Sequence, residues 1–425
     1  MRIRSRVFRL LYTYAAMKMT APVMRKCWPL LLLAASSWPA LAARSVTVGQ
    51  LEQLLDTLYG KSDNKVAQQL SGLDLTERLS QARLSHWEEK FPGPKTHVAL
   101  IKLADLAAFL NPPAEDVVPI PAPDSDTRDR MLELAAEYVK AATARLPDLF
   151  ATRETMHFED TPSLNSVVST GTIPFGLHAA REPGVAMSRT EYKSLHYTGA
   201  TSTSVTYRNG MEIHGSDAAK SESHNEPSTG LTTSGEFGPI LSLVIGDAMR
   251  SQQMGWLRWE QSPADPVAVF RYSVPADQSN DLVRVPLGGT LKQVYPAYHG
   301  EIAIDPSTGA ILRLSIVAEM PPPYQAMETA ILVEYAPVTI GAQSYFCPMR
   351  GVAFSKVPVV QAGSARDGAA VPVQTQVNDV AFAHYHLFRS DARILTGPGD
   401  VPAAPQQPSS ASPERSNTPP HGRDR

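Results

Sequence analysis

The sequence contains only two cysteines in 425 residues, Cys27 and Cys347. Cys27 lies in an N-terminal segment that we expect to be removed, so the remaining chain could form no internal disulfide. Cys27 also precedes the nearby apolar run instead of following it, which argues against a lipid-attachment cysteine. For Cys347 we expect a small apolar core residue, because free cysteine is usually buried. A reactive thiol is the alternative.

The chain also lacks an apolar run long enough to cross a membrane, which takes roughly 20 residues. The apolar stretch Trp28–Ala35 is much shorter; Arg25 and Lys26 precede it, and Ala40-Leu41-Ala42 follows. A basic start, a short apolar core and small residues at a cleavage site are typical of a secretory signal peptide. We therefore expect a signal peptide over residues 1–42, a secreted protein in the periplasm or the medium, and no transmembrane span in the mature chain.

The sequence also has no excess of basic over acidic residues. The expected signal removes seven of the 39 basic residues and no acidic one, leaving 32 basic and 42 acidic residues and a net charge of −10. Nucleic-acid binding depends on basic patches, so we expect no nucleic-acid partner. Electrostatic docking to anionic lipid is disfavoured for the same reason.

Several motifs that would indicate catalysis are absent. The sequence has no G-x-S-x-G nucleophile elbow, no H-E-x-x-H zinc helix, no P-loop and no G-x-G-x-x-G after a strand. We expect a non-catalytic protein without a cofactor, although an active site assembled from distant residues stays open.

Two histidines are the best candidates for metal chemistry. On a strand, His384 and His386 point to one face about 7 Å apart, a spacing that can chelate one metal ion. The further ligand would come from a distant histidine, with His196, His214, His224 and His299 as the candidates. The simpler interpretation is two imidazoles on a sheet surface.

Weaker candidates for catalytic or metal-binding residues have simple structural explanations. His157 with Glu159 and Asp160 is explained by a strand with a polar turn, and Tyr298–Glu301 by the entrance of a strand. Asp305 is expected to form an Asx-type turn and not a metal site.

The hydrophobic periodicity changes along the chain. Residues 43–110 show capped amphipathic helices, one of them opening at Thr76, and predict a helical domain. Residues 111–126 are rich in proline and acid and predict an extended linker. From residue 127 to 395 we expect one helix opening at Thr127 and then an antiparallel sheet. The tail 396–425 is too polar to fold and is expected to be disordered.

Turn chemistry predicts the hairpins of that sheet. Asn209-Gly210 between alternating segments is a strong hairpin signal. Asp305–Gly309 supplies proline and glycine for a turn between two further strands, with alternation after it. Hairpins are also expected around residues 261–266 and 341–342, and a long last strand over 377–387.

One segment interrupts the strands. Phe237–Arg250 has proline at a helix-start position and apolar residues on nearly every side, which predicts a helix buried all round. A further strand is the alternative. The predicted fold class is therefore α+β: an N-terminal helical bundle, then a large curved antiparallel β-sheet with an inserted apolar helix.

Three stretches carry a resemblance: Tyr298–Leu314, Val333–Pro348 and Tyr385–Leu395. They resemble recurring segments in a family of uncharacterised secreted bacterial proteins, which implies no particular activity. The architecture is also loosely similar to the periplasmic lipoprotein-carrier (LolA-like) half-barrel. Fold similarity of this kind does not imply function, and the helical domain departs from the carrier pattern.

These observations favour an exported protein that binds an apolar ligand, such as a lipid or a lipidated peptide, in its curved sheet. The residues expected to line that site are Ile240, Leu243, Val244, Phe270, Tyr272, Leu312, Leu314 and Ile316. A cell-envelope protein–protein interaction module is one alternative, with an exposed apolar patch near Trp87 or Phe109. A hydrolase using His384, His386 or His299 is the other.

Overall fold

The computed structural model describes residues 43–162, 164–169, 185–190, 192–213, 231–263, 265–287, 290–325, 327–359 and 372–387. These residues form an α+β protein with six α-helices and a ten-stranded antiparallel sheet. The chain divides into two compact units, residues 1–114 and 115–425. The expected signal peptide and the expected disordered tail lie outside the described residues.

The described part of the first unit, residues 43–114, contains four α-helices and a short parallel strand pair. They are β1 (Arg44–Val46), α1 (Val48–Leu58), α2 (Asp63–Ser71), β2 (Leu73–Leu75), α3 (Gln81–Lys90) and α4 (Pro94–Leu106). Thr47 caps α1 through a capping box with Gln50. The helix expected to open at Thr76 begins only at Gln81, because Leu73–Leu75 pairs with β1, a partner far away in the sequence.

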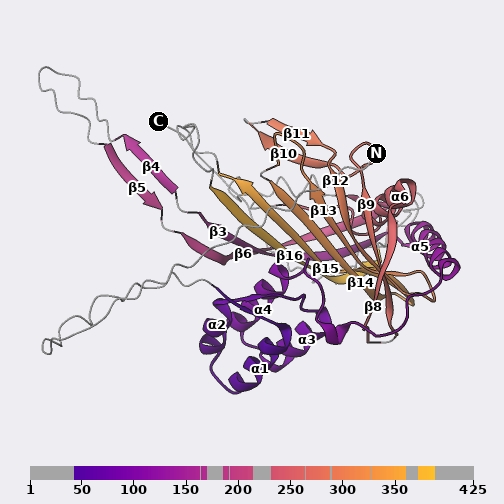
Figure 1. Cartoon of the computed structure of the whole chain (residues 1–425), viewed down its shortest axis with the longest axis horizontal. Coiled ribbons are helices and arrows are strands. Elements are labelled where there is room, and N and C mark those ends of the chain that lie inside the picture. The colour runs from indigo at the N-terminus through magenta and orange to yellow at the C-terminus, as the bar shows by residue number, and fades with distance from the viewer. Residues whose placement is uncertain are drawn as a thin grey trace, which may run out of the picture. The chain divides into compact units, whose positions relative to one another are not determined.

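The second unit is built on one large sheet, with strand order β7-β6-β3-β16-β15-β14-β13-β12-β9-β8 (Figure 1). Its strands are β3 (Leu149–Thr161), β6 (Lys193–Arg208), β7 (Met211–Ile213), β8 (Met254–Glu260), β9 (Val267–Val274), β12 (Ala297–Ile304), β13 (Ile311–Glu319), β14 (Glu328–Ile340), β15 (Gln343–Pro358) and β16 (Val373–Leu387). Two two-stranded ribbons accompany it, β4 (Leu164–Ser169) with β5 (Val185–Thr190) and β10 (Val283–Leu287) with β11 (Thr290–Val294).

The four predicted hairpins are confirmed as β6–β7, β8–β9, β12–β13 and β14–β15. Asn209 and Gly210 have φ values of 51° and 78°, as a type I′ turn requires. Asp305 accepts hydrogen bonds from the Ser307 N–H at 2.8 Å and from the hydroxyl groups of Ser307 and Thr308. Asp305 therefore forms the expected Asx-type turn.

Helices α5 (Ser125–Arg145) and α6 (Pro239–Ser251) pack together on one face of this sheet (Figure 1). Helix α5 starts earlier than Thr127, because the Asp124 side chain accepts a hydrogen bond from the Thr127 N–H at 2.8 Å. Gly309 lies directly against α5: a Cβ at this residue would lie 2.4 Å from the Leu134 backbone. The hairpin β12–β13 therefore reaches α5 only because residue 309 is glycine.

The segment before α5 covers one edge of the sheet. The Val118 N–H donates to the Trp259 carbonyl at 3.1 Å, and the Gln261 N–H donates to the Asp116 carbonyl at 2.8 Å. These bonds place residues 116–118 beside β8. This part of the expected linker also contains a short 3-10 helix, η1 (Ala114–Asp116).

Candidate ligand-binding face

The face of the sheet under α6 brings together most of the predicted lining residues. Six of them belong to one buried cluster: Ile240, Val244, Phe270, Tyr272, Leu314 and Ile316. Leu243 packs against the same cluster from α6. Val244 is fully buried and Phe270 is 1% exposed, and both belong to this one cluster, so α6 covers these strand residues.

Leu312 does not belong to this cluster, although simple alternation places it with Leu314. Ile304 pairs with Ile311 whereas Ala303 pairs with Arg313, so Leu312 is the extra residue of a β-bulge. Ile311 therefore shares the buried face with Leu314. Leu312 packs in a separate cluster with Val267, Val269 and Ala303.

The chain just before α6 is held down by side chains of the sheet. Three side chains donate hydrogen bonds to its backbone carbonyls: Asn378 to Leu231 (3.0 Å), Arg153 to Thr233 (2.9 Å) and Tyr335 to Glu236 (3.0 Å). A fourth side chain, Glu212, accepts a hydrogen bond from the Phe237 N–H (3.0 Å). Because these contacts satisfy main-chain groups that no strand pairs, they fix residues 231–237 on the sheet face without adding a strand.

Glu236 is the most enclosed charged group of this segment, at 1% exposure. Its Oε1 accepts a hydrogen bond from the Thr233 hydroxyl and lies 3.6 Å from Arg153 Nη2. Its Oε2 has no hydrogen-bond partner among the described residues. A carboxylate held in this way is stabilised mainly by the single guanidinium beside it.

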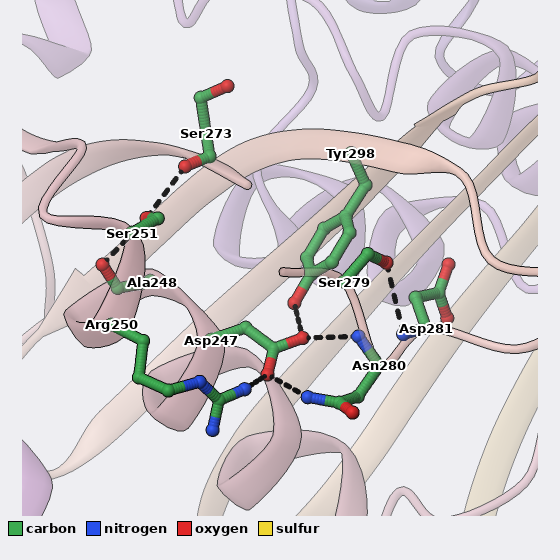
Figure 2. Close-up of polar contacts among 9 residues, drawn as sticks. All are labelled: Asp247, Ala248, Arg250, Ser251, Ser273, Ser279, Asn280, Asp281 and Tyr298. Carbon is green, nitrogen blue, oxygen red and sulfur yellow. Dashed lines mark hydrogen bonds and ion pairs between the residues drawn. The ribbon is translucent and has the colours of Figure 1, made fainter. Parts of the chain in front are cut away.

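The other end of α6 is held through Asp247, a carboxylate that is 1% exposed (Figure 2). Four groups donate to it: Arg250 Nη2, the Asn280 N–H at 2.8 Å, Asn280 Nδ2 at 2.7 Å and the Tyr298 hydroxyl at 2.9 Å. Both carboxylate oxygens are thus satisfied. Asp247 ties α6 to strand β12 and to the loop after β9.

This loop carries a second carboxylate, Asp281. Burial, and then the negative charge of Asp247, raise the pKa of Asp281 to about 6. Burial, with the hydrogen bond to Asp247 next, likewise raises the pKa of Tyr298, so this phenol stays protonated and donates. A pocket of about 520 Å³ opens beside the site, lined by Arg250 and residues 277–280.

Cys347 lies in the buried cluster under the strap formed by residues 231–238, next to Phe237 and Phe382. It is fully buried, and burial raises the pKa of its thiol to about 12. The expectation of a core cysteine is confirmed, and a thiolate at neutral pH is excluded on physical grounds.

The two histidines proposed as metal ligands lie on a strand whose alternation is interrupted. Ala383 pairs with Thr152 and His386 with Phe150, so His384 and Tyr385 together oppose one residue. His384 has a φ of 53°, and both imidazoles are exposed. Within the described ranges, no group of three or more His, Cys, Asp or Glu side chains could hold a metal ion.

Three further histidines have local partners, whereas the candidates His214 and His224 lie outside the described residues. The Nδ1 of His196 lies 3.0 Å from the Ser194 carbonyl oxygen. His157 lies 2.8 Å from the Asn378 side-chain oxygen and 3.1 Å from the Thr201 hydroxyl, in the sheet interior. His299 pairs with the exposed Glu319 at 3.0 Å. His299 lies on β12 and His384 on β16, with three strands between them, so these imidazoles do not form one site.

The chain matches no protein-family model, no curated protein and no solved structure. The resemblances seen in the sequence therefore stay predictions. None of the described helices is long and apolar enough to span a membrane.

The sequence did not predict that Asp247, Asn280 and Tyr298 hold α6 in place, although it contains one signal that points to Asp247. Asp247 is the only carboxylate in the otherwise apolar stretch Phe237–Arg250. The prediction that this helix is buried all round is wrong, since Ser242 and Met249 of α6 are exposed. Asp247 lies on the buried side of the helix, where a carboxylate must find donors inside the protein. The partners themselves, Asn280 and Tyr298, could not be named, because they are more than 30 residues away in the chain.

Proposed function

We propose that the protein is an exported, non-catalytic binding protein whose curved sheet takes up an apolar ligand, a lipid or a lipidated peptide, in the place that α6 occupies. One observation carries this proposal. The middle of α6 contributes only apolar side chains to the sheet face, whereas polar side chains hold its two ends. An element fixed in this way can leave an apolar surface as a unit.

Burial of α6 on the sheet face and burial of an acyl chain in its place contribute comparable free energies. Helix α6 buries four large apolar side chains, Ile240, Leu241, Val244 and Ile245, worth about 1.5–3 kcal/mol each and so about 6–12 kcal/mol together. An acyl chain of about 12 methylene groups gains about 10 kcal/mol on burial at 0.8 kcal/mol per group. A ligand of this length would therefore compensate for the apolar contacts of the displaced helix, and the polar contacts at its two ends add to the free energy that displacement requires.

Residues with positive φ values lie just before and just after α6, where the chain changes direction. Gly235 and Gly238 have φ values of 94° and 154°, which side-chain-bearing residues rarely adopt. Gln252 ends the helix in the left-handed conformation at φ 53°. These positions would serve as hinges, since a few residues at element ends absorb the dihedral changes of such motions.

Native mass spectrometry of the protein recovered from the envelope fraction, before and after organic extraction, tests this proposal. We expect an added mass that extraction removes, on a polypeptide that starts at Ala43. A bare polypeptide that also fails to bind a fluorescent fatty acid after extraction would contradict apolar-ligand binding. A chain that retains residues 1–42 in that fraction would contradict export with signal cleavage.

Two leucines of one strand provide a matched pair of variants. Leu314 belongs to the cluster under α6, whereas Leu312 packs in the separate cluster. Leu314→Ala should weaken binding of the fluorescent fatty acid several-fold, and Leu312→Ala should leave it unchanged. Equal effects of both changes would mean that the probe binds elsewhere.

A second candidate is a cell-envelope interaction module in which the helices of residues 43–110 act as an independent bundle, joined to the sheet domain by residues 111–126. Tyr59 favours it: its side chain is 69% exposed and packs edge-on against Phe91, with ring centroids 6.3 Å apart. Trp87, expected near an exposed patch, is instead buried at 4% exposure, with Phe91 against it and Lys90 Nζ 4.6 Å from its ring centroid, so Tyr59 alone supplies the exposed aromatic surface here. Loss of a specific cross-link to an envelope protein in Tyr59→Ser would support this candidate, and an unchanged cross-link pattern would count against it.

A further inference from the structure

Three of the four groups that bind the Asp247 carboxylate belong to elements other than α6 (Figure 2). The Asn280 N–H and the Tyr298 hydroxyl donate to its Oδ2 at 2.8 Å and 2.9 Å, and Asn280 Nδ2 donates to its Oδ1 at 2.7 Å. The fourth donor, Arg250, lies on α6 itself, three residues after Asp247. If α6 left the sheet, Arg250 would move with Asp247, and the three other donors, here called the cradle, would stay behind.

The groups of the cradle match one kind of ligand atom. All three are donors, so only an acceptor can replace Asp247 between them. Tyr298 is fully buried, and a buried hydroxyl without a partner is costly. A carboxylate offers two oxygens in the arrangement that the cradle already binds, whereas an ammonium group offers no acceptor at all.

The cradle lies at one end of the apolar face. Tyr298 belongs to the same buried cluster as Val244 and Ile240. These two residues of α6 precede Asp247 by three and seven positions, on one side of the helix, so Ile240 lies about 10 Å from Asp247 along the helix axis. An extended chain advances roughly 1.2 Å per bond, so about nine bonds reach from the cradle to the place of Ile240.

The other side of the cradle faces the pocket of about 520 Å³ that Arg250 and residues 277–280 line. Asn280 is exposed, whereas Tyr298 is fully buried. The donors therefore span the boundary between this pocket and the apolar face. A ligand bound here could keep its charged group at the pocket and its chain on the sheet.

We propose that the ligand of the apolar face is a free long-chain carboxylic acid whose carboxylate takes the place of Asp247 between Asn280 and Tyr298. This inference rests on the displacement of α6 proposed above. Asp247 would thus be an internal substitute for the ligand's own acid group.

The charge balance favours a carboxylate over a more highly charged group. Asp281 is close enough to Asp247 for the two negative charges to repel each other. An acid that replaces Asp247 brings one negative charge where one leaves, so this repulsion does not grow. An alkyl phosphate would bring up to two negative charges to the same place and is disfavoured.

Calorimetric titration of the extracted full chain with dodecanoic acid and with dodecan-1-ol at pH 7 tests the headgroup. Both ligands carry the same alkyl chain and must displace the same helix, so the ratio of their dissociation constants reports the headgroup contact alone. We expect the acid to bind about tenfold more tightly or better, because hydrogen bonds to a charged acceptor are the stronger ones. Equal affinities would overturn this inference and leave apolar-ligand binding standing, whereas binding of neither ligand would overturn both.

Variants of the cradle test the contact itself. Asn280→Ala and Tyr298→Phe each remove one donor, and each should lower the preference for the acid several-fold. A weaker hold on α6 in these variants affects both ligands equally and leaves the ratio unchanged. Gln278→Ala is the matched control, since Gln278 lines the same pocket but is not among the described donors to Asp247. An undiminished preference in both cradle variants, or tighter binding of dodecyl phosphate than of the acid, would overturn the inference.

Discussion

The Tyr298 hydroxyl donates a hydrogen bond of 2.9 Å to the fully enclosed Asp247 carboxylate, which joins strand β12 to helix α6. Asp247 has only neutral donors and the guanidinium of Arg250 to offset its loss of hydration. Each donor is therefore important, since a buried charge without partners is costly. This contact makes the position of α6 sensitive to a single phenol.

Tyr298→Phe should lower the free energy of unfolding by about 1–3 kcal/mol, because it leaves one lone pair of Asp247 without a donor. Urea denaturation followed by circular dichroism measures the change. Tyr272→Phe is the control, since the Tyr272 hydroxyl donates to the uncharged Ser315 carbonyl at 2.7 Å and its loss should cost less. An equal loss in both variants would show that Asp247 does not depend on Tyr298.

Stability should depend on pH through Asp281. Burial, and then Asp247, raise the pKa of Asp281 from 3.8 to about 6, so the folded protein binds this proton more tightly than the unfolded chain. The contribution of Asp281 therefore makes the free energy of unfolding fall as the pH rises from about 4 to about 6. The fall amounts to at most about 3 kcal/mol.

Asp281→Asn should remove this contribution and be more stable than the unmodified protein at pH 7, with a smaller difference at pH 4. Urea denaturation of both proteins at pH 7 and at pH 4 measures the difference in their free energies of unfolding. The same difference at both pH values would contradict a raised pKa at this position.

Gly309→Ala should destabilise the second unit strongly. The residue has a φ of 75°, and the new methyl group would lie 2.4 Å from the Leu134 backbone, which cannot move out of the way without shifting α5. We expect a loss well above the ~1 kcal/mol of a positive φ alone.

Gly341→Ala is the matched control, because its φ of 67° is similar and only the flexible Leu387 side chain lies close, at 3.0 Å. Thermal denaturation of both variants compares the two sites. Similar losses would mean that the approach of α5 to Gly309 adds nothing.

Cys347 should not react with a thiol reagent in the native protein at pH 8, because it is buried and its pKa is raised to about 12. It should react fully in denaturant. The experiment uses the Cys27→Ser chain, so that a single thiol is counted. Rapid native reaction would show that the cluster around Phe237 opens often.

Much of the fold could be predicted because its causes are local. Asn209-Gly210 and Asp305–Gly309 adopt their turns through the conformations and hydrogen bonds of those few residues, and the hairpins follow. The candidate site could be predicted only in part. The alternation of apolar residues correctly predicted that Leu314 and Ile316 share one face of the sheet. It wrongly placed Leu312 on the same face, because the β-bulge at this residue cannot be recognised in a short apolar sequence.

The sequence by itself determined the elements: the caps, the hairpin turns, the core position of Cys347 and the apolar character of Pro239–Ser251. Only the tertiary structure decided how these elements combine. The Asn280 contact to Asp247 and the Asn378 contact to the strap of residues 231–238 join positions 33 and 147 residues apart in the chain. Local conformational preference acts within a few residues, whereas register and burial depend on which distant surfaces exclude water together.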